Sequence, residues 1–293
     1  MQLFVHSSRM TLLEKHMRSL NRDLATAVSK VLDDPKPKSV HRLRTTIRRI
    51  ESLVSYADPE ISEKEERSLE KLTDLRKRAG KVRDLDVQAD LLGTLGNGSA
   101  TKDRKTLAEL LEKKRDQQAK RLESAVKKLH EAKFFARLDR IAERAAEPQD
   151  GKNRPLAPLE EAKAQLAEMA KDFGSGETMT PNRLHGARVA LKRIRYMAEL
   201  AEESTEQKEF MRELKSAQDA IGDWHDWQEL TERAEKRFSD RANSALVREA
   251  RTVLSARHSD ATSAVSKLFS MAHSRDKKPP RAVRSIRTDV RSA

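Results

Sequence analysis

The sequence predicts an all-α protein, and its composition is the first observation that does so. Charged residues make up 37% of the 293 residues, whereas aromatic residues make up 4%. This balance is typical of helices that bury a narrow apolar stripe and expose charge elsewhere. The chain has only 9 glycines and 9 prolines, and a β-protein would need more turns and more aromatic and β-branched side chains. The length allows one large domain or two ordinary ones with ample core.

Proline and glycine divide the first half of the chain into predicted helices. Asp33–Pro37 separates a helix near residues 9–32 from a second near residues 38–57, which ends at Asp58-Pro59. The next clear break is Gly93–Ser99. One long charged helix, or two helices, then follow to about residue 146.

The second half is predicted to repeat this plan after a proline-containing linker. Its predicted elements are a helix near residues 159–173, a loop at 174–176, a basic helix near 181–203 and further helices to about 271. The end of the chain is basic and almost free of apolar residues, which is typical of disorder. We divide the chain into a first helical half at residues 1–146, a linker at 147–158, a second helical half at 159–272 and a basic, disordered tail at 273–293.

Two of the predicted helices carry nearly the same sequence. Residues 37–50 and 181–194 share a proline, a histidine, two arginines and an isoleucine in register, and Arg48 is matched by Lys192. At helical periodicity the basic residues of each copy share one face, and the apolar residues fall on the opposite face. The two basic stripes comprise His41, Arg44, Arg48 and Arg49 in the first copy and His185, Arg188, Lys192 and Arg193 in the second.

Each repeated helix is expected to begin at its proline, because the first helical position needs no backbone N–H donor. Thr180 is a good N-cap before the second copy, whereas Lys36 is a poor one before the first and leaves Ser39 as the candidate cap. Both histidines then lie within the first two turns, near backbone N–H groups that attract anions.

Acidic residues are missing from both repeated helices. None occurs from Pro35 to Ile50 or from Thr178 to Ala198, although the chain contains 47 Asp and Glu. Unpaired like charges on one helix face cost a few tenths of a kcal/mol per pair, so binding to an anion explains these stripes better than a solvated face does. Other basic runs have acidic neighbours three or four residues away, and we interpret those as solvated surface.

A second repeated element indicates an internal duplication. Leu75–Asp84 aligns with Ala217–Asp226, glycine with glycine and aspartate with aspartate, at nearly the same distance downstream of each histidine. Two ordered motifs at near-constant separation predict two similar four-helix units.

The residues within this second element have structural interpretations. We expect Gly80 and Gly222 to mark a helix kink or close packing, and Asp84 and Asp226 to orient a nearby arginine or histidine rather than to act as catalytic or magnesium-binding carboxylates. The tryptophans that flank His225 are expected in the core.

The net charge of +13 favours a polyanionic partner, through counterion release and long-range steering. The absence of cysteine excludes disulfides, thiol nucleophiles and thiolate metal sites. No signal peptide and no apolar run of the roughly 18 residues needed to span a bilayer is evident. We therefore expect a cytoplasmic protein with no membrane partner.

The two histidines allow three interpretations: a structural role, a metal site, or hydrogen bonding to phosphate. Neither half offers a His-x3-His pair or a carboxylate on the same face, so we expect no metal. A ring N–H donor, or a protonated ring, fits the basic neighbours best. The chain also lacks a P-loop and a Gly-x-Ser-x-Gly element, so we expect no catalytic residues and no cofactor.

The two motifs together resemble the CHAD domain, the conserved histidine α-helical domain. The resemblance rests on His-x-x-Arg-x-x-x-Arg/Lys-Arg in both copies and on Gly-x-x-Arg83-Asp84 downstream of the first, and it covers roughly residues 5–270. The chain departs from the pattern at Glu51, which aligns with Arg195, and at His225, which aligns with Arg83.

This resemblance implies two pseudo-symmetric four-helix bundles with a basic cleft or channel between them. It also implies non-catalytic binding of inorganic polyphosphate, and often targeting to polyphosphate granules. The binding residues carried over from the family are His41, Arg44, Arg48, Arg49 and Arg83 on one side and His185, Arg188, Lys192, Arg193 and Arg195 on the other.

Three other functions remain alternatives to a polyphosphate-binding protein. A nucleic-acid-binding protein would share the charge but is expected to offer aromatic stacking platforms or a recognition helix. An enzyme acting on phosphoanhydrides would release phosphate in the presence of magnesium. A structural helical adaptor would have basic faces that bind no anion.

Overall fold

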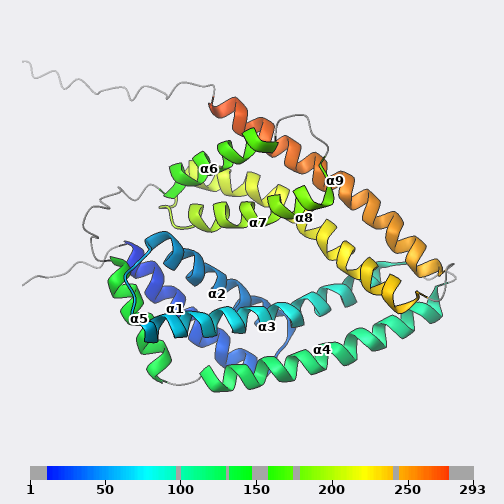
Figure 1. The fold of residues 1–293 in the computed structure, drawn as a ribbon, viewed down its shortest axis with the longest axis horizontal. Helices are drawn as coiled ribbons and strands as arrows, with labels where there is room; N and C mark the ends of the chain where they lie inside the picture. The colour runs from blue at the N-terminus through cyan, green and yellow to red at the C-terminus, as the bar shows by residue number, and fades with distance from the viewer. Residues whose placement is uncertain are drawn as a thin grey trace, which may run out of the picture.

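The part of the chain that the structure describes is entirely helical, as the sequence predicts (Figure 1). This computed structural model describes residues 12–96, 100–129, 132–146, 158–173, 179–239 and 244–276. The helices within these ranges are α1 (Leu12–Asp33), α2 (Pro37–Ala57), α3 (Glu63–Thr94), α4 (Thr101–Leu129), α5 (Ala132–Ala146), α6 (Pro158–Phe173), α7 (Pro181–Ala198), α8 (Thr205–Arg237) and α9 (Ala245–Asp276). None of them is both long and apolar enough to cross a membrane.

Within residues 12–146, the structure describes five helices, not four, packed around one apolar core. Helices α1 to α5 all contribute to it, with Met17, Leu43, Leu72, Leu122 and Leu138 fully buried at its centre. The charged stretch that ends at residue 146 forms two helices, α4 and α5, rather than one. The prediction of a four-helix unit is therefore wrong for this half, because α5 adds a second apolar stripe that packs against α1.

The second half encloses a separate core with four helices, α6 to α9. Leu191, Phe210 and Leu268 lie in this core together with Trp224, which is 2% exposed. Trp227 is 3% exposed and belongs to a third cluster described below. The expectation that both tryptophans lie in the interior is confirmed.

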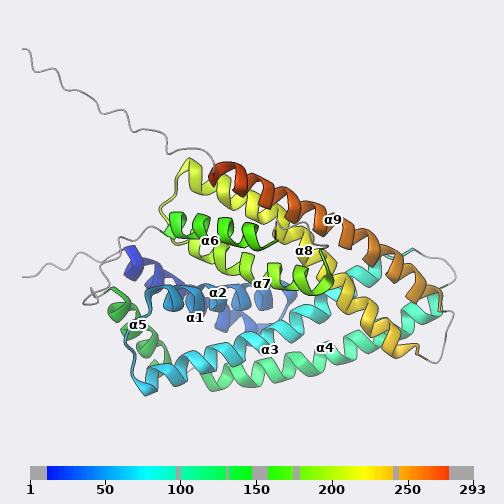
Figure 2. The ribbon, with the colours of Figure 1, turned by 45° about the horizontal axis from the view of Figure 1, so that its top comes forward.

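The two halves are joined by a third apolar cluster at one end of the molecule. The long hairpins α3–α4 and α8–α9 extend beyond their bundles and converge there, as both views show (Figures 1 and 2). Leu85 and Leu107 of the first half pack there with Trp227, Leu230 and Leu246 of the second. Closer to the bundles, α2 lies beside α7 and α3 contacts α8. The repeated basic helices are therefore neighbours in space.

The ends of the basic helices follow local sequence signals. Both α2 and α7 begin at their prolines, and Thr180 caps α7 by accepting a hydrogen bond from the Arg183 N–H at 3.4 Å. Ser39 does not cap α2, because its hydroxyl donates instead to the carbonyl oxygens of Asp34 and Lys36 at 2.8 and 2.9 Å.

Two predicted helix ends are displaced. Helix α7 ends at Ala198 rather than near residue 203, because Leu200 turns towards the core of the first half and is 9% exposed there. Helix α9 continues to Asp276, beyond the predicted end near residue 271, and Phe269 and Ala272 are buried in the second core. The linker residues before Pro158 and the tail from residue 277 onwards lie outside the described residues.

Candidate polyanion site

Helices α2 and α7 bury their apolar stripes and leave their basic stripes accessible, as predicted. Leu43, Ile47, Leu191 and Ile194 are buried in the two cores. On the opposite faces, four basic side chains are half-buried and four are exposed. The half-buried residues are Arg44, Arg48, Arg188 and Lys192, and the exposed residues are His41, Arg49, His185 and Arg193.

The basic stripes of the two helices lie within electrostatic range of each other. Burial, followed by the positive charges of Arg188, Arg48 and Arg44, lowers the pKa of Lys192 to about 7, and Asp226 opposes this shift only in part. Burial, then Arg48, lowers the pKa of Arg44 to about 10, and Arg188 of the other helix adds to that shift. The structure therefore brings the cations of the two halves together.

These four half-buried cations have no partner within the described part of the chain. None of Arg44, Arg48, Arg188 or Lys192 forms a side-chain hydrogen bond or an ion pair there, and the Arg188 Nε atom is buried and unsatisfied. Removing charged groups from water without pairing them costs free energy. The protein thus maintains a cluster of cations that an anionic ligand would stabilise.

The two repeated aspartates lie beside this cluster. Burial raises the pKa of Asp84 and of Asp226, and the charges of Arg44 and Arg188 partly reverse the shift for Asp84. Neither carboxylate forms a hydrogen bond or an ion pair with a base in the described ranges. The predicted orienting role is therefore replaced by an electrostatic one, in which the aspartates offset part of the positive charge.

The two repeated glycines are not explained by close packing. A Cβ atom at Gly80 would lie 3.6 Å from the Nε atom of Arg44, which is ordinary van der Waals contact, and a Cβ at Gly222 would meet no atom within 4 Å. Helices α3 and α8 run through these positions without a break. The expectation of close packing at the glycines is therefore wrong, and the alternative expectation of a helix kink stays a prediction.

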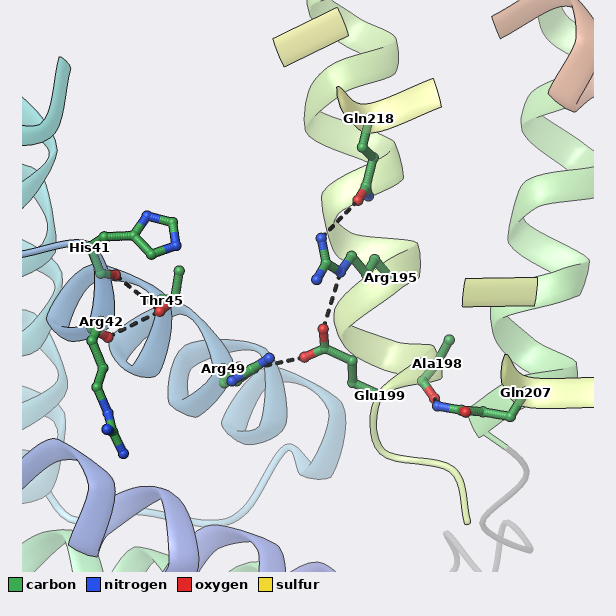
Figure 3. Close-up of polar contacts among 9 residues, drawn as sticks. All are labelled: His41, Arg42, Thr45, Arg49, Arg195, Ala198, Glu199, Gln207 and Gln218. Atoms are coloured by element: carbon green, nitrogen blue, oxygen red, sulfur yellow. Dashed lines mark hydrogen bonds and ion pairs between the residues drawn. The ribbon is translucent and has the colours of Figure 1, made fainter. Parts of the chain in front are cut away.

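Arg49 and Arg195 are less available than the sequence predicts. Figure 3 shows both side chains directed at Glu199, with Nε–Oε distances of 2.8 Å for Arg49 and 3.1 Å for Arg195. Arg195 also donates to Gln218 on α8 at 3.3 Å. Burial is the largest influence and lowers the pKa of Arg49, but the hydrogen bond to Glu199 and the charge of that carboxylate together outweigh it and raise the pKa. These two arginines join α2 to the end of α7.

His41 lies at the other end of the stripe on α2. Its ring and the side chain of Arg42 point in different directions in Figure 3, and Arg42 pairs with Asp23 of α1 at 2.9 Å. Partial burial, then the charges of Arg83 and Arg44, lowers the pKa of His41. Arg83 therefore lies near the stripe as predicted.

On the second half, His225 occupies the position that Arg83 has on the first. The ring centroids of His225 and His185 are 5.8 Å apart, and His225 Nε2 lies 3.4 Å from a carboxylate oxygen of Glu229. A hydrogen bond from His225 lowers the pKa of Glu229, and Gln88 of α3 donates to the same carboxylate at 3.2 Å. Sequence reasoning missed Glu229, although its spacing of one helical turn from His225 was a usable signal.

The remaining predicted positions lie apart from these contacts. Arg193 is exposed on α7, and no interaction with another described residue ties it to the cluster. Glu51 accepts a hydrogen bond from Thr73 at 2.7 Å and pairs with Arg76 at 2.6 Å, so it fastens α2 to α3. Within the described ranges, no group of His, Cys, Asp and Glu side chains is suited to hold a metal ion. The cleft between the halves stays a prediction.

The structure is that of an all-α protein in which two similar basic helices, α2 and α7, lie side by side. The sequence model of the CHAD domain matches residues 15–235, so the chain belongs to the CHAD-domain family. The prediction made from the two motifs is confirmed.

Two solved structures share the fold. The crystal structure of the CHAD domain from the plant Ricinus communis is 18% identical, covers 89% of this chain and 90% of that chain, and superposes with a TM-score of 0.66. PptA from Streptomyces chartreusis is 17% identical, covers 90% of this chain and 98% of that chain, and has a TM-score of 0.59. A search of curated protein sequences finds no match.

Proposed function

We propose that this protein binds inorganic polyphosphate and does not turn it over. The observation that carries the proposal is the cluster of four half-buried cations, Arg44, Arg48, Arg188 and Lys192, which form no ion pair in the described part of the chain and whose charge nearby aspartates offset only in part. Two homologous helices supply them, so a single anion would be held from two sides. The chain belongs to the CHAD-domain family, and its resemblance to that family implied a polyphosphate-binding module. Family membership therefore supports the same ligand.

The chemistry of the cluster suits a linear chain of identical phosphates. Guanidinium groups form charge-assisted and often bidentate hydrogen bonds with phosphate oxygens, and lysine adds a mobile point charge. The exposed rings of His41 and His185 can donate N–H groups at the ends of the stripes. A ligand that repeats one chemical group needs no base-specific contacts, so cations alone can bind it. Association with polyphosphate granules in the cytoplasm is part of this proposal.

Nucleic acid is the alternative polyanion. It shares the dependence on salt, but binding of single strands usually depends on aromatic platforms. Trp224 and Trp227 are buried in apolar clusters and are not available for stacking. Competition between long-chain polyphosphate and DNA or RNA at fixed salt distinguishes the two ligands, and we expect polyphosphate to displace both.

The double charge reversal Arg48→Glu/Lys192→Glu tests the proposal. Isothermal titration with long-chain polyphosphate should show tight binding to the wild type, weakening steeply with salt, and almost none to the variant. Lys113→Glu/Lys114→Glu changes the net charge equally at exposed positions of α4 and should bind like the wild type. Circular dichroism should show unchanged helicity in both variants.

Wild-type affinity in the Arg48→Glu/Lys192→Glu variant would contradict the site. An equal loss of affinity in the α4 variant would show that only the net charge of the protein matters. Incubation of the wild type with polyphosphate and magnesium tests the non-catalytic part separately. We expect no phosphate release, and release would show an enzyme.

A further inference from the structure

A basic hollow opens from the cation cluster towards α3 and α4. It has a volume of about 420 Å³, and Arg44 and Arg48 of α2 line it on one side. Lys77 and Lys81 of α3 and Arg121 of α4 line it further out. Helix α7 contributes no residue to its lining. The hollow therefore extends the cluster into the first half alone.

A second, larger groove continues the hollow between α3 and α4. It measures about 820 Å³ and shares Asp74, Arg78 and Arg121 with the first hollow. Leu75 and Leu129 are buried residues among its lining. The charged side chains that line it include three exposed lysines, Lys71, Lys120 and Lys128.

Most cations along these two hollows lack an acidic partner. Asp74 is paired with Arg78 at 2.7 Å, and Arg67 is paired with Glu63. Glu70 and Asp84 are the other carboxylates that line them. Besides Arg44 and Arg48, six lining cations form no ion pair or side-chain hydrogen bond with any described residue; they are Lys71, Lys77, Lys81, Lys120, Arg121 and Lys128. We call these six residues the α3–α4 track.

The second half has the opposite charge at the matching positions. When the glycine-aspartate elements of α3 and α8 are aligned, Lys77 and Lys81 correspond to Asp219 and Asp223. Both aspartates are paired with bases of the second half. A polyanion leaving the central cluster would therefore be attracted along α3, whereas the paired charges on α8 offer it no comparable attraction.

We propose that the α3–α4 track binds a continuation of the same polyphosphate chain, so that the protein selects long chains over short ones. This inference rests on the proposed function, because the track begins at the central cluster. From Lys81 to Lys71 the track follows α3 for about 15 Å. A chain of three phosphates is too short to occupy the cluster and the far end of the track together, whereas a long chain can reach both.

Neutralising the far end of the track tests this inference. The variant Lys71→Gln/Lys120→Gln/Lys128→Gln removes three exposed charges with little change in helix propensity. We expect its affinity for long-chain polyphosphate to fall about tenfold and its salt slope to fall by about three. Its affinity for tripolyphosphate should equal that of the wild type.

A matched control removes the same charge elsewhere on α4. Lys105, Lys113 and Lys114 are exposed and line neither hollow, so Lys105→Gln/Lys113→Gln/Lys114→Gln should bind both ligands like the wild type. Unchanged binding of long chains by the track variant, or an equal loss in the control, would overturn the track.

The central variant Arg48→Glu/Lys192→Glu separates this failure from failure of the proposed function. It should lose binding of both tripolyphosphate and long chains. If it keeps both, the proposed function fails; if it loses both while the track variant behaves like the wild type, only the track fails.

Discussion

On the neighbouring helices α2 and α7, the two halves of the chain carry cations at positions that match in sequence, since Arg44 aligns with Arg188 and Arg48 with Lys192. On the next pair, α3 and α8, the halves carry opposite charges, since Lys77 matches Asp219. Because the two halves match on α2 and α7, they form a cluster of cations that makes no ion pair in the described ranges. Because α3 and α8 differ in charge, a basic surface extends from the cluster along the first half but not along the second.

This difference suggests two separate requirements on a duplicated fold. Under the proposed function both halves contribute to one ligand site, which requires bases on the two helices that meet at the centre. The flanking helices are free to diverge, because each faces its own surroundings. On α8 the acidic residues pair with neighbouring bases, as Asp223 does with Arg257 at 2.9 Å. A polyanion bound at the centre therefore meets an asymmetric field.

Arg48 and Lys192 align in sequence but differ in chemistry. This difference predicts that polyphosphate binding depends on pH, and the expected effect is larger than that of changing the flank of α8. The pKa of Lys192 is lowered to about 7, so the free protein loses this charge between pH 6 and 8. A bound polyanion restores the proton, and affinity for long-chain polyphosphate should fall about tenfold over that range. Titration calorimetry at constant ionic strength measures it.

The variant Lys192→Arg is the control for this pH dependence, because a guanidinium stays protonated throughout. Its affinity should be nearly constant from pH 6 to 8. The stability of the free protein tests the direction of the Lys192 pKa shift. Above pH 7 the lysine keeps its proton in the unfolded chain and loses it in the folded protein, so the free energy of unfolding should rise with pH. Equal pH profiles for the wild type and Lys192→Arg would contradict the role of Lys192.

Converting the flank of α8 to that of α3 gives a smaller effect. The variant Asp219→Lys/Asp223→Lys places lysines where α3 has Lys77 and Lys81. We expect severalfold tighter binding of long-chain polyphosphate and a salt slope that is steeper by about two. Tripolyphosphate affinity should change less than long-chain affinity. A long-chain affinity that does not rise would show that the flanks do not contribute.

Much of the fold could be predicted because its signals are local. Prolines mark the starts of α2 and α7, Thr180 caps α7, and α2 ends at Asp58, the one described non-glycine residue with a positive φ, 44°. The end of α7 could not be predicted, because it depends on Leu200 packing in the core of the other half. Tertiary contacts of this kind leave no periodic signal in the sequence.

The candidate site could also be predicted in part, where its signals are local in the sequence. The eight residues of the repeated stripes include the four cations that the structure places together, although the sequence did not distinguish these four from the rest. Glu199 was not identified, since it lies far along the chain from Arg49 and meets it only in the fold. The α3–α4 track was also missed, because its bases come from two helices and have acidic residues near them in sequence.

The central claim is that the cations of α2 and α7 hold one polyphosphate chain together. Titration calorimetry of the single variants Arg48→Glu and Lys192→Glu with a long-chain polyphosphate of defined length tests it most directly. We predict that either change lowers the affinity while the number of chains bound per protein stays the same as in the wild type. Two independent sites would give the opposite result, in which each change removes part of the binding capacity and leaves the affinity of the remainder unchanged.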